Sequence, residues 1–231
     1  GGTIDVEAQT GSIDMDADAT ATAVGNLRYL AAQNADITGL KGANVRVEAT
    51  AGSITDAGGP GKDVEATAAQ LVAGGSVGGA GAAAIDTQVG TLAARASGGS
   101  VYVSEADALT LGTVGAIDVN RIGLDSSTTP LAGEELSAAV RAKQNVKIEN
   151  GVDAAGDLTV STVVGAGDDV LLNARQGDLK VNAAVSAGKQ ADDDMTLLAS
   201  GGVSQGADGD ITAGGTIDVE AQTGSIDMDA D

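Results

Sequence analysis

The chain has 231 residues, with 33 acidic and 12 basic side chains, a formal net charge of −21, and no Cys, His, Trp or Phe. These counts exclude disulfides, Cys/His metal sites and histidine-based catalysis. A pI near 4.1 argues against nucleic-acid binding, and the apolar runs are far shorter than the ~20 residues of a membrane-spanning helix. Because 42% of the residues are hydrophobic, we expect a folded chain with a thin core of Val, Ile, Leu and Ala rather than disorder.

The first 18 residues, GGTIDVEAQTGSIDMDAD, return unchanged at 214–231, an offset of 213 residues. A shared fold would preserve the pattern of such a segment but not every surface residue, so the identity indicates a tandem array. Residues 1–213 then form one period and 214–231 begin the next. The alternatives are a single duplication or an engineered overlap. We expect the chain to be a window of a much longer protein.

Short segments of alternating apolar and polar residues recur along the chain, and most of them begin with Gly, Asn or Asp. A period of two predicts half-buried strands. The residues predicted to face inward are Ile4, Val6, Ala8, Ile13, Met15, Ala17, Val45, Val47 and Ala49. Those predicted to face outward are Asp5, Glu7, Asp14, Asp16, Arg46 and Glu48, together with both tyrosines, Tyr29 and Tyr102.

An all-β parallel β-helix, or β-solenoid, of roughly 10–12 coils is favoured by three features. The segments resemble one another, their inward residues are small, and the long period is exact. With coils of about 20 residues stacked at ~4.8 Å, one period would rise about 50 Å. A chain of immunoglobulin-like domains is the alternative. That fold would call for a buried Trp or a tyrosine corner, and neither is recognisable here.

Residues 124–144 interrupt the alternation and contain Pro130, one of two prolines. Residues 134–143 are helix-like in composition. We interpret the segment as an irregular insertion into the coil stack. It either covers one flank of the stack as a loop or carries a binding function.

Two acidic groups are candidate calcium ligands. Residues 164–172 approach the calcium-binding nonapeptide of repeat proteins and include Asp168 and Asp169, but the pattern is not repeated after Asn173. Asp192, Asp193 and Asp194 are consecutive, and stacked carboxylates could bind Ca²⁺. The other interpretation is a solvated acidic face, with the three aspartates in a turn between coils. Calcium is thus the one candidate cofactor. We expect no catalytic residues, since a polysaccharide-cleaving cleft would need aromatic or basic groups to hold sugar.

Residues 99–112 and 115–119 read GSVYVSEADALTLG and GAIDV. Their Gly-, Ala-, Val- and Thr-rich pattern resembles the repeats of filamentous-haemagglutinin-like adhesins, which are very large bacterial exoproteins. The resemblance extends over most of the chain outside 124–144. It implies a right-handed parallel β-helix, secretion across a Gram-negative envelope, and a role in surface attachment or filament formation. The secretion domain of that family is not in this sequence, so the route stays open.

The expected function is therefore structural and not enzymatic: a stiff extracellular or cell-surface fibre for adhesion, sheath or matrix formation. Its partners would be identical repeats end to end, with lateral self-association or attachment to a host or neighbouring cell. The alternative is an adhesin repeat that recognises a carbohydrate or protein through residues 124–144. Without the five acids of 214–231 the net charge is −16 per period, roughly one charge per 3 Å of axis. Such a polyanionic rod would need salt or divalent cations to pack sideways.

Overall fold

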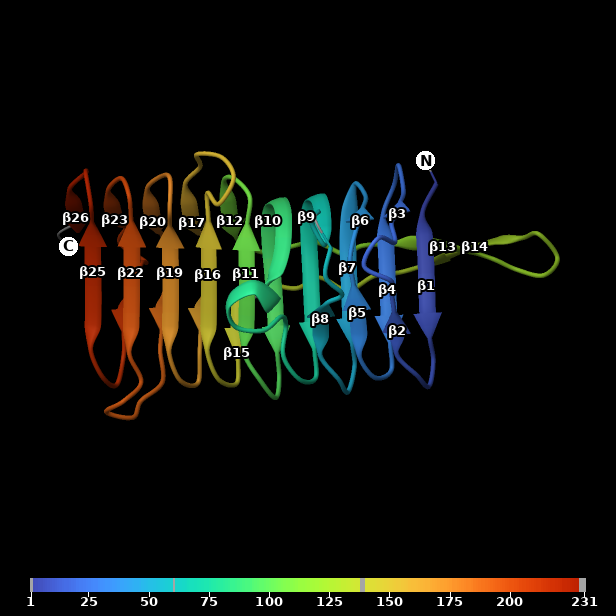
Figure 1. The fold of residues 1–231 in the computed structure, drawn as a ribbon, viewed down its shortest axis with the longest axis horizontal. Helices are drawn as coiled ribbons and strands as arrows, with labels where there is room; N and C mark the ends of the chain where they lie inside the picture. The colour runs from blue at the N-terminus through green and yellow to red at the C-terminus, as the bar shows by residue number, and fades with distance from the viewer. Residues whose placement is uncertain (1, 60, 138–139, 229–231) are drawn as a thin grey trace.

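The computed structural model describes residues 2–59, 61–137 and 140–228, which form an elongated stack of about 10 coils (Figure 1). The coil strands pair in parallel with the coils before and after them, and one short 3₁₀-helix, η1 (Gly81–Ala83), lies in a connection. The predicted all-β solenoid is therefore confirmed.

In the N-terminal half, each coil contains one longer strand and two shorter ones. The longer strands are β1 (Ile4–Ala8), β4 (Leu27–Ala31), β7 (Asn44–Ala49), the second part of β9 (Val64–Ala73) and the second part of β10 (Ile85–Ala96). The shorter strands are β2 (Ile13–Asp14), β5 (Ala35–Ile37), β8 (Ile54–Asp56), β3 (Ala21–Thr22), β6 (Leu40–Lys41) and the first parts of β9 and β10.

The C-terminal half follows the same plan. Its longer strands are β11 (Val101–Glu105), β16 (Val146–Asn150), β19 (Val170–Ala174), β22 (Met195–Ala199) and β25 (Ile217–Ala221). Its shorter strands are β12 (Leu109–Leu111), β17 (Leu158–Val160), β20 (Leu179–Val181), β23 (Val203–Gln205), β26 (Ile226–Met228), β15 (Val140–Ala142), β18 (Val164–Gly165), β21 (Val185–Ser186) and β24 (Ile211–Thr212).

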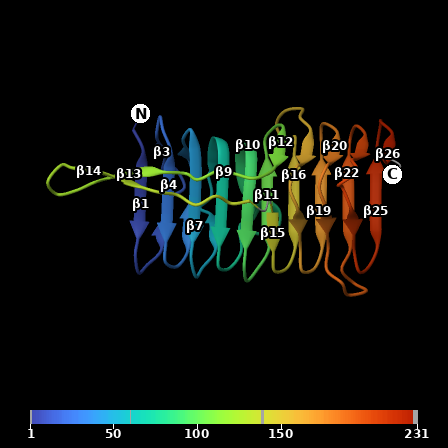
Figure 2. The same cartoon turned by 180° about the vertical axis from the view of Figure 1, so that it is seen from behind.

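The longer strands change sides of the stack at β10 and β11. The second part of β10 is followed in the stack by two shorter strands, β12 and β15. Conversely, β11 continues both short-strand columns of the N-terminal half, through Val77 and through the first part of β10. Each coil is thus two-sided, and the long-strand side of the C-terminal half lies opposite that of the N-terminal half (Figures 1 and 2).

The core consists of stacked aliphatic residues in register, as the alternation predicts. Val45, Val47 and Ala49 are fully buried, and the predicted inward residues of β1 and β2 also pack on the core. Ala17 is exposed beyond the end of β2, so its inward placement was wrong. Tyr29 corrects a second prediction. It is buried between Val6 and Val47 because it alternates in phase with Leu27 and Ala31. Tyr102 faces outward, as predicted.

A ladder of polar side chains follows one corner of the stack, at the residue just before β2, β5, β8, Val77, β11, β16, β19 and β22. In each coil a side-chain oxygen accepts a hydrogen bond from the backbone N–H of the equivalent residue in the next coil, at 2.7–3.2 Å. The donors run from Asn34 to Thr216, and the accepting residues are Ser12, Asn34, Ser53, Ser76, Ser100, Asn145, Asp169 and Asp194. This ladder explains why so many of the alternating segments begin with a polar residue.

The insertion is a β-hairpin and not a helix. It leaves the stack after β12 and returns at β15, and it contains the antiparallel strands β13 (Val119–Ile122) and β14 (Thr128–Leu131). The predicted boundaries, 124–144, were therefore too late. The helix expected over 134–143 was also wrong in the described residues, because Leu136 bridges to Val114 while Val140–Ala142 stacks on β10. Residues 138–139 lie outside the described residues. The hairpin runs back along the N-terminal half and projects beyond β1 (Figure 2).

Candidate functional site

The hairpin is anchored at its base by Gln70, an outward-facing but fully buried residue of β9. The Gln70 Nε2 lies 2.9 Å from each of three backbone carbonyl oxygens, those of Val114, Gly115 and Glu134. Its Oε1 accepts a hydrogen bond from Arg46. One amide thus holds both legs of the insertion against the solenoid.

A small apolar cluster seals the same region. Val72 and Ala93 point outward from β9 and β10, and they are buried against Val114, Ile117 and Leu136 of the insertion. Outward positions of a solenoid strand normally face water. Apolar residues at such positions therefore mark the part of the face that the insertion covers.

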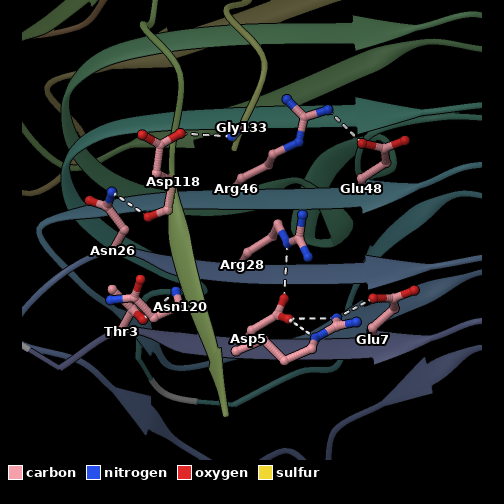
Figure 3. A network of polar contacts seen from close by, with 11 residues as sticks. Thr3, Asp5, Glu7, Asn26, Arg28, Arg46, Glu48, Asp118, Asn120 and Gly133 are labelled. Atoms are coloured by element: carbon pink, nitrogen blue, oxygen red, sulfur yellow. Dashed lines mark hydrogen bonds and ion pairs between the residues drawn. The ribbon is translucent and has the colours of Figure 1, made fainter. Parts of the chain in front are cut away.

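Toward the tip, Arg121 of β13 binds β1 through two carboxylates (Figure 3). Its Nη2 lies 2.6 Å from Asp5 Oδ2 and also donates to Glu7, while Arg28 Nε donates to Asp5 Oδ1 at 2.9 Å. The Asp5 side chain is only 5% exposed. Burial tends to raise the pKa of Asp5, but the hydrogen bonds from Arg28 and Arg121 outweigh it, so that the pKa is lowered. Hydrogen bonding to Arg121 likewise lowers the pKa of Glu7.

Backbone contacts complete the attachment. Asn26 Nδ2 donates to the Asp118 carbonyl at 2.8 Å, and the Asn120 N–H donates to Thr3 Oγ1 at 2.9 Å (Figure 3). The Asp118 carboxylate accepts the Gly133 N–H at 2.7 Å, which links the two legs. The hairpin is therefore fixed along its length from β9 to β1. Sequence reasoning identified the insertion but missed this interface; the outward Gln70 and Val72 are the signal that could have revealed it.

The candidate calcium ligands lie in turns that open neighbouring coils. Asp169 and Asp194 belong to the corner ladder, and Asp169 Oδ1 accepts the Asp194 N–H at 2.8 Å. Asp193 is buried and accepts the N–H of Gln190, Asp168 is half-buried, and Asp192 is exposed. Within the described ranges, no group of three or more His, Cys, Asp or Glu could hold a metal ion. Calcium binding at these aspartates stays a prediction.

A shallow hollow lies on the opposite side of the stack, beside η1. It is lined by Tyr102, Lys147, Glu149 and Arg175, among others. Glu149 is paired there with both Lys147 (3.2 Å) and Arg175 (3.5 Å). Two cations engage this carboxylate, so the arrangement does not resemble a carboxylate pair poised for acid–base catalysis.

Comparison with known proteins returned no matching family model, curated protein or solved structure. Over the part of the chain that the structure describes, no helix has the length and apolar character needed to cross a membrane. A function for this chain therefore has to be inferred from its fold, its repeated end sequence and the hairpin interface.

Proposed function

We propose that this chain is a structural repeat of a giant secreted or cell-surface bacterial protein, in which successive periods stack into one stiff β-solenoid fibre. The observation that carries the proposal is that one 18-residue sequence occupies both ends of the stack. As β25 it pairs with the preceding strand, β22, and as β1 it pairs with the following strand, β4. Taken together, the two copies supply both neighbours that a strand within an uninterrupted stack requires.

Differences in exposure between the two copies support continuous stacking. Ile13 is 9% exposed beneath β5, whereas its equivalent Ile226 is 47% exposed. Likewise Asp5 is almost fully buried beside Arg28 and Arg121, while Asp218 is exposed. A further coil placed on β25 and β26 would bury the apolar residues that they expose. The hydrophobic gain is about 25 cal/mol for each Å² of apolar surface removed from water.

The strand pairings define how periods would follow one another. Four coil steps separate β1 from β10, half a coil leads to β11, and four further steps lead to β25. At ~4.8 Å per coil this is a rise of about 40 Å per period. Because of the half coil, the hairpins of successive periods would lie on opposite sides of the fibre.

The resemblance to filamentous-haemagglutinin-like adhesins is the reason to place this fibre outside the cell, in adhesion, sheath or matrix. An antibody raised against residues 119–131 tests this assignment on the source cells. We expect it to label intact cells or extracellular material and to detect a denatured polypeptide far larger than 22.2 kDa. A cytoplasmic band near 22 kDa would contradict both the array and the location.

The second candidate is ligand recognition through the insertion, which the exposed hairpin tip favours. A chain in which Gly-Gly replaces residues 123–127 separates the two functions. Lost attachment to a cell or glycan surface with intact fibres would support a binding role. Unchanged attachment per fibre length would support the structural role alone.

A further inference from the structure

We propose that the hairpin tip, residues 122–127, docks on the outward faces of β22 and β19 of the preceding period and so clamps each junction of the array. This inference rests on the proposed tandem stacking. It assigns the tip a partner, a second copy of the repeat. Three features support it: where the hairpin ends, which residues it exposes there, and what the identical segments 1–18 and 214–231 place beneath it.

The tip projects over empty space beyond β1. Arg121 is the last hairpin residue held by β1, through Asp5 and Glu7. Beyond it Ile122 is 66% exposed and Leu124 is completely exposed. The turn is nevertheless closed, because Gly123 N donates to Ser127 O at 2.8 Å and Ser126 N donates to Gly123 O at 2.9 Å. A hydrogen-bonded turn that holds Leu124 in water beyond the last attached residue supports an unfilled interface at the tip.

The sequence identity shows what would lie beneath the tip. When β25 of one period serves as β1 of the next, the coils before it are β22 and β19. β13 ends at Ile122, whose side chain faces away from the stack because successive strand side chains alternate and Arg121 faces β1. The turn that follows carries Leu124, at most about 10 Å beyond Arg121 at ~3.3 Å per residue, a distance that spans the two preceding coils at ~4.8 Å each.

Two leucines face outward at that place, beside Thr196 and Asn173. β22 presents Thr196 and Leu198 outward, and Leu198 is in register with Glu220, the equivalent of Glu7. β19 presents Leu171 and Asn173, and Leu171 is in register with Thr196, which continues the row of Asp218, the equivalent of Asp5. Leu198 and Leu171 thus lie directly along the path of the hairpin. Val72 in β9, an outward apolar residue that the base of the same hairpin covers, shows the same arrangement within one period.

The hairpin of the next period would also lie on the side of the stack that carries β22 and β19. Within one period the hairpin covers the long-strand side of the N-terminal half, and the long-strand side of β16 to β25 lies opposite (Figures 1 and 2). The half coil per period brings the next hairpin to this opposite side. Docking therefore requires no change of fold in either period.

A two-period chain, residues 1–213 followed by 1–231, tests the clamp. The natural sequence contains no cysteine, so Leu171→Cys in the first period and Leu124→Cys in the second give one defined pair. The matched control pairs Leu124→Cys with Thr159→Cys in β17, on the other side of the stack. We expect mild oxidation to form an intramolecular disulfide in the first chain at least about tenfold faster than in the control. Equal rates, or no disulfide, would overturn the clamp.

Solution scattering on the same two-period chain keeps this result separate from the proposed stacking. A rod about 40 Å longer than the single-period chain, without selective cross-linking, contradicts the clamp alone. A chain that scatters as two independent bodies contradicts the stacking itself.

In a cysteine-free two-period chain, a Thr128→Ser marker in one period distinguishes the two hairpin peptides. Amides of 124–127 should then exchange at least about tenfold more slowly in the second period than in the first, where nothing lies beneath the tip. Equal exchange would contradict docking.

Discussion

At the scale of the residue, Gln70 couples the insertion to the solenoid. Replacing Gln70 with Ala would remove its amide contacts to the insertion and leave the buried Arg46 guanidinium without its Gln70 acceptor, which costs about 1–3 kcal/mol. We expect Gln70→Ala to lower the free energy of unfolding by that amount and to speed amide exchange in residues 112–137.

Gln88→Ala is the matched control, because Gln88 makes one exposed hydrogen bond, to Asp107. We expect this variant to change stability by less than about 0.5 kcal/mol. Equal effects of the two substitutions in denaturant titrations would show that Gln70 does not anchor the hairpin.

We expect Asp63 to make the stability of the fold depend on pH. Burial raises its pKa from 3.8 to about 8, and nearby Asp56 and Asp86 add to the rise, although the Asp86 N–H donates to its carboxylate. A folded-state pKa above the unfolded value means that the neutral form stabilises the fold. This contribution is complete below about pH 3.8 and is lost as the pH rises to about 8.

Asp63→Asn should therefore remove a slope of up to about 1.4 kcal/mol per pH unit between pH 4 and 8. The variant should also be more stable than the natural chain at pH 9. Unfolding titrations across this range measure both effects, and parallel curves for the two proteins would refute the assignment.

At the scale of the element, the corner ladder ties each strand to the next coil. Asp194 Oδ1 accepts the Thr216 N–H at 2.7 Å, whereas Asp192 is exposed in the same turn. We expect Asp194→Ala to lower the free energy of unfolding by about 1 kcal/mol, and Asp192→Ala to be nearly neutral. If calcium bound these aspartates, both variants would weaken a calcium-dependent rise in thermal stability, which calorimetry with and without Ca²⁺ would detect.

The elements differ in how far the sequence predicts them. The strands were predictable because alternation alone determines which side of a short strand is buried, as in β7. The hairpin was not, because its contacts join residues such as Arg121 and Asp5 that are more than a hundred positions apart. Alanine-rich composition suggested a helix over 134–143, a range that includes β15. Val140 and Ala142 instead form a strand that pairs with Ala94 and Ala96 of β10, because tertiary packing overrides weak helix propensity.

At the scale of the whole molecule, charge should control how fibres associate. A net charge of −16 per period over about 40 Å is roughly one negative charge per 2.5 Å of axis. We expect fibres to stay separate at low salt and to bundle when salt or Ca²⁺ is added, because counterions screen their repulsion. Light scattering against NaCl, with CaCl₂ at matched ionic strength, measures this response. Bundling that is independent of both would contradict it.

A continuous fibre depends on unbroken stacking between periods. The most direct test is small-angle scattering of chains with one, two and three periods, each closed by residues 214–231. Unbroken stacking predicts a length that increases by about 40 Å per added period at a constant cross-section radius. Increments that vary, or a cross-section that changes as expected for flexibly joined bodies, would contradict it.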